Sequence, residues 1–65
     1  MYINRMKYFR NMKNITLKDL ANMTGISAGY LCHLEKGTRK NPSIHIMESI
    51  AKNLGESVSD VFFLK

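Results

Sequence analysis

The sequence lacks most of the devices that stabilise very short chains. Its 65 residues include one cysteine, which excludes an internal disulfide. Two histidines and that cysteine fall short of the four ligands of a structural zinc site. A chain of this length buries only about 60% of the surface that its unfolded form exposes. Helix packing, self-association, or both must therefore stabilise the fold.

Long apolar runs and catalytic patterns are also missing. No run approaches the roughly 20 residues of a membrane helix, and residues 1–13 contain no apolar segment typical of a signal peptide. The lone thiol, Cys32, fits a reducing compartment. There is no glycine-rich phosphate loop and no Ser–His–acid set at a useful spacing. We expect a cytoplasmic protein that is not an enzyme, with no cofactor, no metal, no small-molecule ligand and no membrane partner.

Acidic residues are few, and the positive charge is concentrated near one end. Ten Lys and Arg residues against five Asp and Glu residues give a formal charge of +5, with a sequence pI of about 9.7. Residues 1–18 carry five basic and no acidic side chains, whereas residues 41–65 are net negative. A pI above about 9 with clustered basic residues is typical of nucleic-acid binders. The alternative is a solvated basic face on a helix.

Five short segments have helical spacing of apolar residues, separated by turn-forming residues. The predicted helices cover about residues 4–13, 16–24, 27–36, 43–54 and 57–62. Strand character is confined to Tyr2–Ile3 and Phe62–Leu64, which could pair as a very short two-stranded ribbon joining the termini. The predicted fold class is therefore all-α, a compact five-helix domain over residues 1–65.

The second and third predicted helices carry the most informative pattern. A three-residue turn begins at Gly25, where glycine permits a positive φ without steric cost. The small side chain of Ala21 allows the two helices to pass close together. This arrangement predicts a helix-turn-helix unit over about residues 16–36. Its shared core is expected to contain Leu20, Leu31 and Leu34.

On these residues the chain resembles the Cro/repressor-type helix-turn-helix family, also called the XRE family, to which lambdoid phage repressors belong. The resemblance covers about residues 3–62. The matching motifs are Thr16–Ala21, Gly25–Ser27, Tyr30–Leu31, Leu34–Gly37, Asn41–Ser43, Ile50–Ala51 and Leu54–Phe62. It implies a lambda-repressor-like fold whose third helix enters the DNA major groove. It also implies a bacterial, phage or plasmid transcriptional regulator, most often a repressor, that binds an inverted-repeat operator as a homodimer.

The same resemblance implies which residues contact double-stranded DNA. The expected base-reading residues are Ser27, Ala28, Gly29 and His33. The expected phosphate contacts are Thr16, Leu17, Lys18, Tyr30, Lys36, Thr38, Arg39, Lys40, Asn41 and Ser43. The alternatives are a tolerated surface glycine at position 29, a packed tyrosine at position 30, and a solvated loop at residues 38–43. The sequence departs from the family at Leu17, where many members have glutamine, and at Ala28 and Gly29, where some have long polar side chains.

Two structural roles complete the predictions. Arg10 and Glu35, which the family often pairs, are expected to form a salt bridge between the first and third helices; the alternative is two exposed, unpaired charges. The fifth helix and the residues after it are the predicted dimer face, with the alternative that they only cap the monomer core. The dimer-face residues are Val58, Val61, Phe62, Phe63 and Leu64.

A second class of function stays open. The chain could be a protein-interaction module, such as an antitoxin subunit whose main partner is a protein. RNA binding is less well supported, because the exposed aromatic sheet of common RNA-binding modules is not predicted here.

Overall fold

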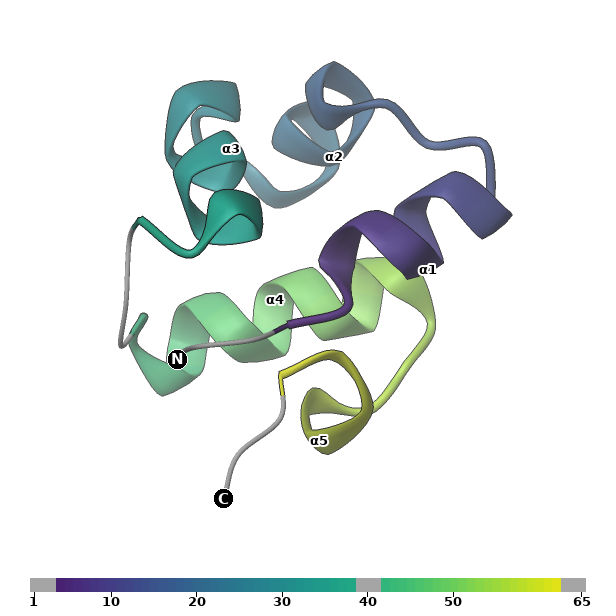
Figure 1. The fold of residues 1–65 in the computed structure, drawn as a ribbon, viewed down its shortest axis with the longest axis vertical. Coiled ribbons are helices and arrows are strands. Elements are labelled where there is room, and N and C mark those ends of the chain that lie inside the picture. Colours follow the sequence, from purple (N-terminus) through teal and green to yellow (C-terminus); the bar gives the residue numbers. More distant parts are fainter. Residues whose placement is uncertain (1–3, 39–41, 63–65) are drawn as a thin grey trace.

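The computed structural model describes residues 4–38 and 42–62, and these residues form five helices (Figure 1). The helices are α1 (Met6–Met12), α2 (Leu17–Thr24), α3 (Ala28–Lys36), α4 (Ile44–Leu54) and α5 (Val58–Val61). The all-α prediction is confirmed, and each helix begins within two residues of its predicted start. Within the described ranges, no helix has the length and apolar character needed to cross a membrane.

Hydroxyl side chains determine where four of these helices begin. Each N-cap hydroxyl accepts a hydrogen bond from the backbone N–H three residues further on. Such caps typically stabilise a helix by about 1 kcal/mol, which matters because isolated helices this short are marginal in water. The capping residues are Thr16, Ser27, Ser43 and Ser57.

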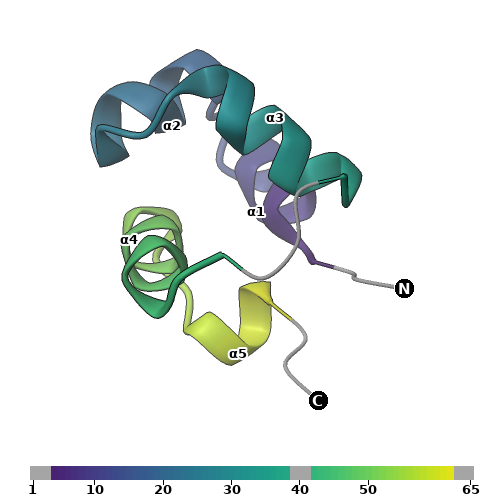
Figure 2. The same ribbon diagram turned by 90° about the vertical axis from the view of Figure 1, so that its left-hand side faces the viewer.

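Apolar side chains from all five helices and from Phe62 meet in one core. Figures 1 and 2 both show α2 and α3 on one side of the molecule and α4 and α5 on the opposite side. No polar or charged residue among those described is fully buried. The stability of the fold therefore depends mainly on apolar burial. The core consists of Met6, Leu20, Leu31, Leu34, Ile50, Ala51, Leu54, Val61 and Phe62.

The two ends of the described chain meet beside α3. Asn4 forms an isolated antiparallel bridge with Phe62, and the Arg5 N–H donates to the Val61 carbonyl oxygen at 2.7 Å. The Asn4 side-chain amide donates to the Leu34 carbonyl oxygen, also at 2.7 Å. Of the predicted two-stranded ribbon, the described residues include only this bridge at Phe62. Tyr2–Ile3 and residues 63–64 lie outside the described residues.

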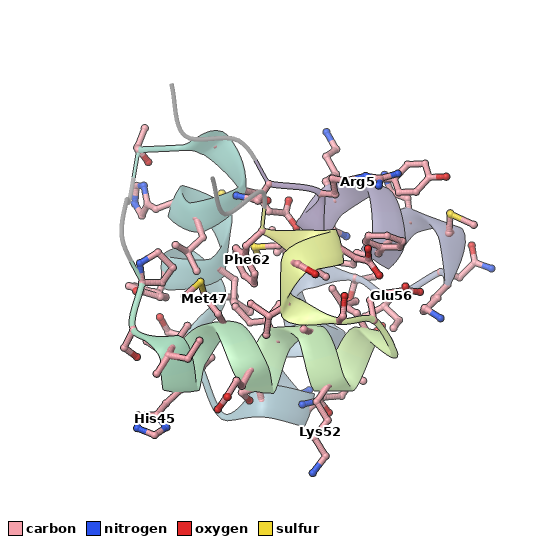
Figure 3. The ribbon with its side chains drawn as sticks, turned by 90° about the horizontal axis from the view of Figure 1, so that it is seen from below. Arg5, His45, Met47, Lys52, Glu56 and Phe62 are labelled. Carbon is pink, nitrogen blue, oxygen red and sulfur yellow. The ribbon has the colours of Figure 1, made fainter. Side chains whose placement is uncertain are left out.

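The prediction that Val61 and Phe62 belong to a dimer face is wrong. Both side chains have no exposed surface in the monomer, and Figure 3 shows Phe62 pointing into the interior. The bridge to Asn4 brings this end of the chain against the core, so the side chains are covered without any second copy. Val58 is half-buried and also packs against the core, and Phe63 and Leu64 lie outside the described residues.

Candidate nucleic-acid interface

The outer face of α3 carries small and polar side chains that the core does not use. At about 100° per residue, Ala28, Gly29, Cys32, His33 and Lys36 occupy an arc of about 140°. Cys32 is half-buried and the other four are exposed. The opposite face supplies two leucines to the core. One face of α3 is therefore fixed in the molecule while the other is presented to solvent.

The expected ion pair between Arg10 and Glu35 is present and fastens α3 to α1. The guanidinium donates from Nε to Glu35 Oε2 at 2.8 Å and from Nη2 to Oε1 at 3.2 Å. A third donor, Nη1, reaches the Ile15 carbonyl oxygen at 2.9 Å. The hydrogen bond to Glu35 raises the pKa of Arg10, against the opposing effect of burial. One side chain thus holds α1, the α1–α2 connection and α3 in register.

Three of the five basic side chains in residues 1–18 contact other groups of the protein; one of them, Lys13, is exposed and reaches a Glu56 carboxylate oxygen only at 3.9 Å. Arg10 is paired as described, and the Arg5 guanidinium lies 4.7 Å from the centre of the Tyr8 ring and 5.1 Å from that of Phe9. Such cation–π contacts contribute about 0.5–1 kcal/mol at exposed sites. The basic cluster near the N-terminus is therefore only partly available to an anionic partner. The exposed members are Lys7, Lys13 and Lys18.

The first turn of α2 combines a reciprocal cap with unpaired backbone donors. The Thr16 hydroxyl accepts from the Asp19 N–H at 3.0 Å, and the Asp19 carboxylate accepts from the Thr16 N–H at 3.1 Å. The N–H groups of Leu17 and Lys18 are the two donors of this turn that no intrahelical acceptor can reach. Leu17 can therefore offer only its backbone to a phosphate, since its half-buried side chain packs against the core.

The other predicted contact residues differ in how accessible they are. Tyr30 is half-buried and packs against the core. Most of the remaining predicted contacts are exposed, so their side chains are accessible to a partner. The exposed residues are Thr16, Lys18, Ser27, Ala28, Gly29, His33, Lys36, Thr38 and Ser43. Arg39, Lys40 and Asn41 lie outside the described residues.

Sequence reasoning missed two residues that position α3. Thr24 donates its hydroxyl to the Leu20 carbonyl oxygen at 2.8 Å and accepts from the Ile26 N–H at 3.2 Å, which ties the end of α2 to the turn. Asn4 satisfies the Leu34 carbonyl oxygen in the last turn of α3. A threonine just before a C-terminal glycine was a usable signal for the first. No local signal existed for the second, because the partners are 30 residues apart.

Replacing Gly29 with alanine is expected to stabilise the protein by up to about 1 kcal/mol, because alanine is the better helix former. An added Cβ at position 29 would meet no atom within 4 Å, so no clash offsets the gain. Urea denaturation followed by circular dichroism measures the change. Gly25→Ala is the matched control and should destabilise, since Gly25 has a φ of +77° that side chains disfavour. A destabilised Gly29→Ala variant would contradict the expectation.

No group of three or more His, Cys, Asp or Glu residues in the described ranges is placed to hold a metal ion. Among the described residues, the candidate site is made of exposed polar side chains, exposed lysines and helix-terminal N–H groups. Groups of this kind contact phosphates and base edges in protein–DNA complexes. The geometry defines a helix-turn-helix unit with one helix face left open.

Comparison with known proteins identifies the family. Residues 6–61 match a family model described as helix-turn-helix, so the chain belongs to the helix-turn-helix family of XRE-type transcription regulators, which are not enzymes. An uncharacterised HTH-type transcriptional regulator of Methanocaldococcus jannaschii is 37% identical over 59 residues, covering 91% of this chain and 88% of the relative. The regulator SinR of Bacillus subtilis is 35% identical over 54 residues, covering 83% of this chain and 49% of SinR.

Solved structures show the same fold. SinR in a crystal structure with DNA superposes with a TM-score of 0.79 at 35% identity, covering 83% of this chain and 86% of that one. The clp gene regulator ClgR of Corynebacterium glutamicum gives a TM-score of 0.77 at 42% identity, covering 85% of this chain and 57% of ClgR. The chain thus spans nearly all of the archaeal relative but only about half of SinR and of the ClgR chain.

Proposed function

We propose that this protein is a sequence-specific double-stranded DNA-binding transcriptional regulator in which α3 is the recognition helix. The observation that carries the proposal is the open outer face of α3, held in place by the Arg10–Glu35 pair and free of any role in the core. The relative SinR, with the same fold, has been crystallised with DNA. A helix of this kind fits the B-DNA major groove, which is about 12 Å wide.

In this proposal, phosphate contacts orient the domain and the start of α3 meets the bases. Three kinds of group contact the DNA phosphates. They are the N–H groups of Leu17 and Lys18, the exposed ammonium groups of Lys18 and Lys36, and the hydroxyl of Ser43. Helix N-termini favour such anions because their N–H groups and dipole both point at the ligand. Ala28 offers a methyl group to thymine, and His33 offers a ring nitrogen to a base edge. Arg39, Lys40 and Asn41 add phosphate contacts.

We further propose that the protein acts as a repressor and binds an inverted repeat as a homodimer. Two-fold symmetry would place the half-sites about 34–36 Å apart, one turn of the duplex. With Val61 and Phe62 inside the monomer, the proposed contact between copies reduces to Val58 and the chain after Phe62.

Selection of duplexes from a random pool, repeated at about 50 and 200 mM salt, is expected to return a palindromic motif. Affinity should fall by at least about a thousandfold between the two conditions if six or more phosphates are contacted. Lys36→Ala should weaken binding to all sequences alike and reduce the salt slope by about one. Lys52→Ala is the matched control, because it also removes one positive charge, from an exposed position near the C-terminal end of α4 (Figure 3). It should leave the salt slope unchanged.

Three results would count against the proposal. Salt-sensitive binding without a motif would mean that the protein does not read sequence. A motif without two-fold symmetry would contradict the homodimer. No binding at either salt concentration would favour the second class of function, in which the main partner is a protein.

A further inference from the structure

At the C-terminal end of α3, the residue Thr38 contacts both the backbone and the side chain of His33. Past Gly37, the Thr38 N–H donates to the His33 carbonyl oxygen at 3.1 Å. The Thr38 hydroxyl donates to the same carbonyl oxygen at 3.2 Å. The hydroxyl oxygen also lies 3.0 Å from Nδ1 of the His33 ring. One threonine therefore contacts both the backbone and the imidazole of this exposed residue.

The Thr38 hydroxyl can donate its one proton to only one of two neighbours, the His33 carbonyl oxygen or Nδ1 of the His33 ring. A threonine hydroxyl has one proton to donate and lone pairs to accept with, whereas a carbonyl oxygen can only accept. With the hydroxyl proton donated to the His33 carbonyl oxygen, as the 3.2 Å contact allows, the hydroxyl oxygen accepts from Nδ1; the opposite arrangement, with the hydroxyl donating to Nδ1, would leave that carbonyl to its backbone donors. Nδ1 must then carry the proton, and Nε2 of the neutral ring has a free lone pair, since a neutral imidazole has one donor and one acceptor nitrogen.

We propose that Thr38 fixes neutral His33 as the Nδ1–H tautomer and thereby makes Nε2 a hydrogen-bond acceptor on the outer face of α3. Thr38 is thus a positioning residue and His33 a specificity-determining one. The tautomer assignment rests on the Thr38 hydroxyl donating to the His33 carbonyl oxygen; its consequence for base choice rests on the proposed function.

The consequence is a preference between bases. In the major groove, adenine presents the N6 amino group and cytosine the N4 amino group as donors. Guanine presents only the acceptors N7 and O6, and thymine the acceptor O4 with a methyl group. An acceptor at Nε2 therefore pairs with adenine or cytosine and is repelled by guanine, thymine or a phosphate oxygen.

The tautomer can be measured without DNA, by two-bond 1H–15N correlation spectra of the histidine rings over a pH titration that identifies the neutral form. His45 is the internal control: it is exposed on α4, points away from the molecule (Figure 3), and its ring has no hydrogen bond among the described residues. We expect the Nδ1–H form for His33 and, for His45, the Nε2–H form that predominates in free histidine. The Nε2–H form at His33 in the unaltered protein would overturn the proposal.

Variants at position 38 test the cause. Thr38→Val keeps the shape but removes the hydroxyl, so the spectrum of His33 should become like that of His45. Thr38→Ser keeps the hydroxyl and should retain the Nδ1–H form. An unchanged His33 in Thr38→Val, with backbone amide shifts confirming the fold, would show that the threonine does not set the tautomer and would overturn its role.

The base preference is tested on the selected operator. Adenine or cytosine at the base pair contacted by His33 should be favoured over guanine by about fivefold, the size of one hydrogen bond. His33→Ala and Thr38→Val should both lose this ratio, and Thr38→Ser should keep it. A uniform loss of affinity in Thr38→Val with an unchanged ratio would mean only a lost phosphate contact and would overturn the inference. Nδ1–H spectra combined with no DNA binding would refute the proposed function and the base preference together, but not the tautomer.

Discussion

Replacing Glu35 with alanine is expected to destabilise the protein by about 3–5 kcal/mol, because the ion pair is almost completely covered and removing one member leaves the other charge without its partner. The side chains of Arg10 and Glu35 are only 11% and 8% exposed. Without the carboxylate, two of the three guanidinium hydrogen bonds described above disappear and the one to Ile15 is left. The charge cannot be neutralised instead, because arginine stays protonated at any working pH.

This loss is comparable with the whole stability of a small domain, which is typically about 5–15 kcal/mol and lowest for short chains. Much of the Glu35→Ala protein should therefore be unfolded at 25 °C. Urea denaturation monitored by circular dichroism gives the free energy of unfolding. Because the lost pair also joins α1 to α3, DNA binding should weaken with it.

Two control variants test whether the destabilisation comes from leaving Arg10 without its partner and not from losing any carboxylate. The double variant Arg10→Met with Glu35→Leu leaves no unpaired charge and should recover most of the lost stability, as apolar replacements of buried pairs often do. Glu56→Ala removes a carboxylate whose contact with Lys13 is long, 3.9 Å, and more exposed. It should change stability by less than about 1 kcal/mol. Equal effects of Glu35→Ala and Glu56→Ala would contradict the assigned role of the buried pair.

Local sequence signals account for the helices and for the turn between α2 and α3. Hydroxyl caps at Thr16, Ser27 and Ser43 determine where helices begin, and Gly25 determines where α2 ends. These features act within four residues of one another, so a single sequence displays them. The open face of α3 follows from the 3.6-residue period in the same way, because Leu31 and Leu34 define the buried side.

Contacts made where the chain turns back on a helix, or between distant residues, were beyond the reach of such signals. The contact between Thr38 and His33 depends on Gly37, whose φ of +78° turns the chain back onto α3. The orientation of α5 depends on the pairing of Asn4 with Phe62 across nearly the whole chain. A helix of four residues is also too short to show a period, so the pattern could not tell which side of α5 faces inward. The two phenylalanines near the end of the chain predict a surface for self-association because exposing them is costly, and burial of Phe62 in the monomer core avoids the same cost for that residue.

The second large effect on stability is expected from substitutions of Phe62, which is fully buried. Phe62→Ala is expected to destabilise the protein by about 3–5 kcal/mol, through lost apolar burial and the cavity left behind. Phe62→Asp should destabilise it further, because a charge would be buried without a partner. Tyr8→Ala is a matched control that removes an aromatic ring which is 51% exposed on α1. Its effect should stay below about 1 kcal/mol, the range of surface substitutions and exposed cation–π contacts.

The interior position and a dimer-face position predict different outcomes for Phe62→Asp. If Phe62 belongs to the core of each monomer, the variant loses its helical circular dichroism signal at every protein concentration. If Phe62 instead joined two copies, the variant would keep that signal and sediment as a folded monomer. Sedimentation velocity and circular dichroism on the same sample distinguish the two. A folded monomeric Phe62→Asp protein would refute the interior position, because the core has no polar side chain among the described residues to pair with a carboxylate.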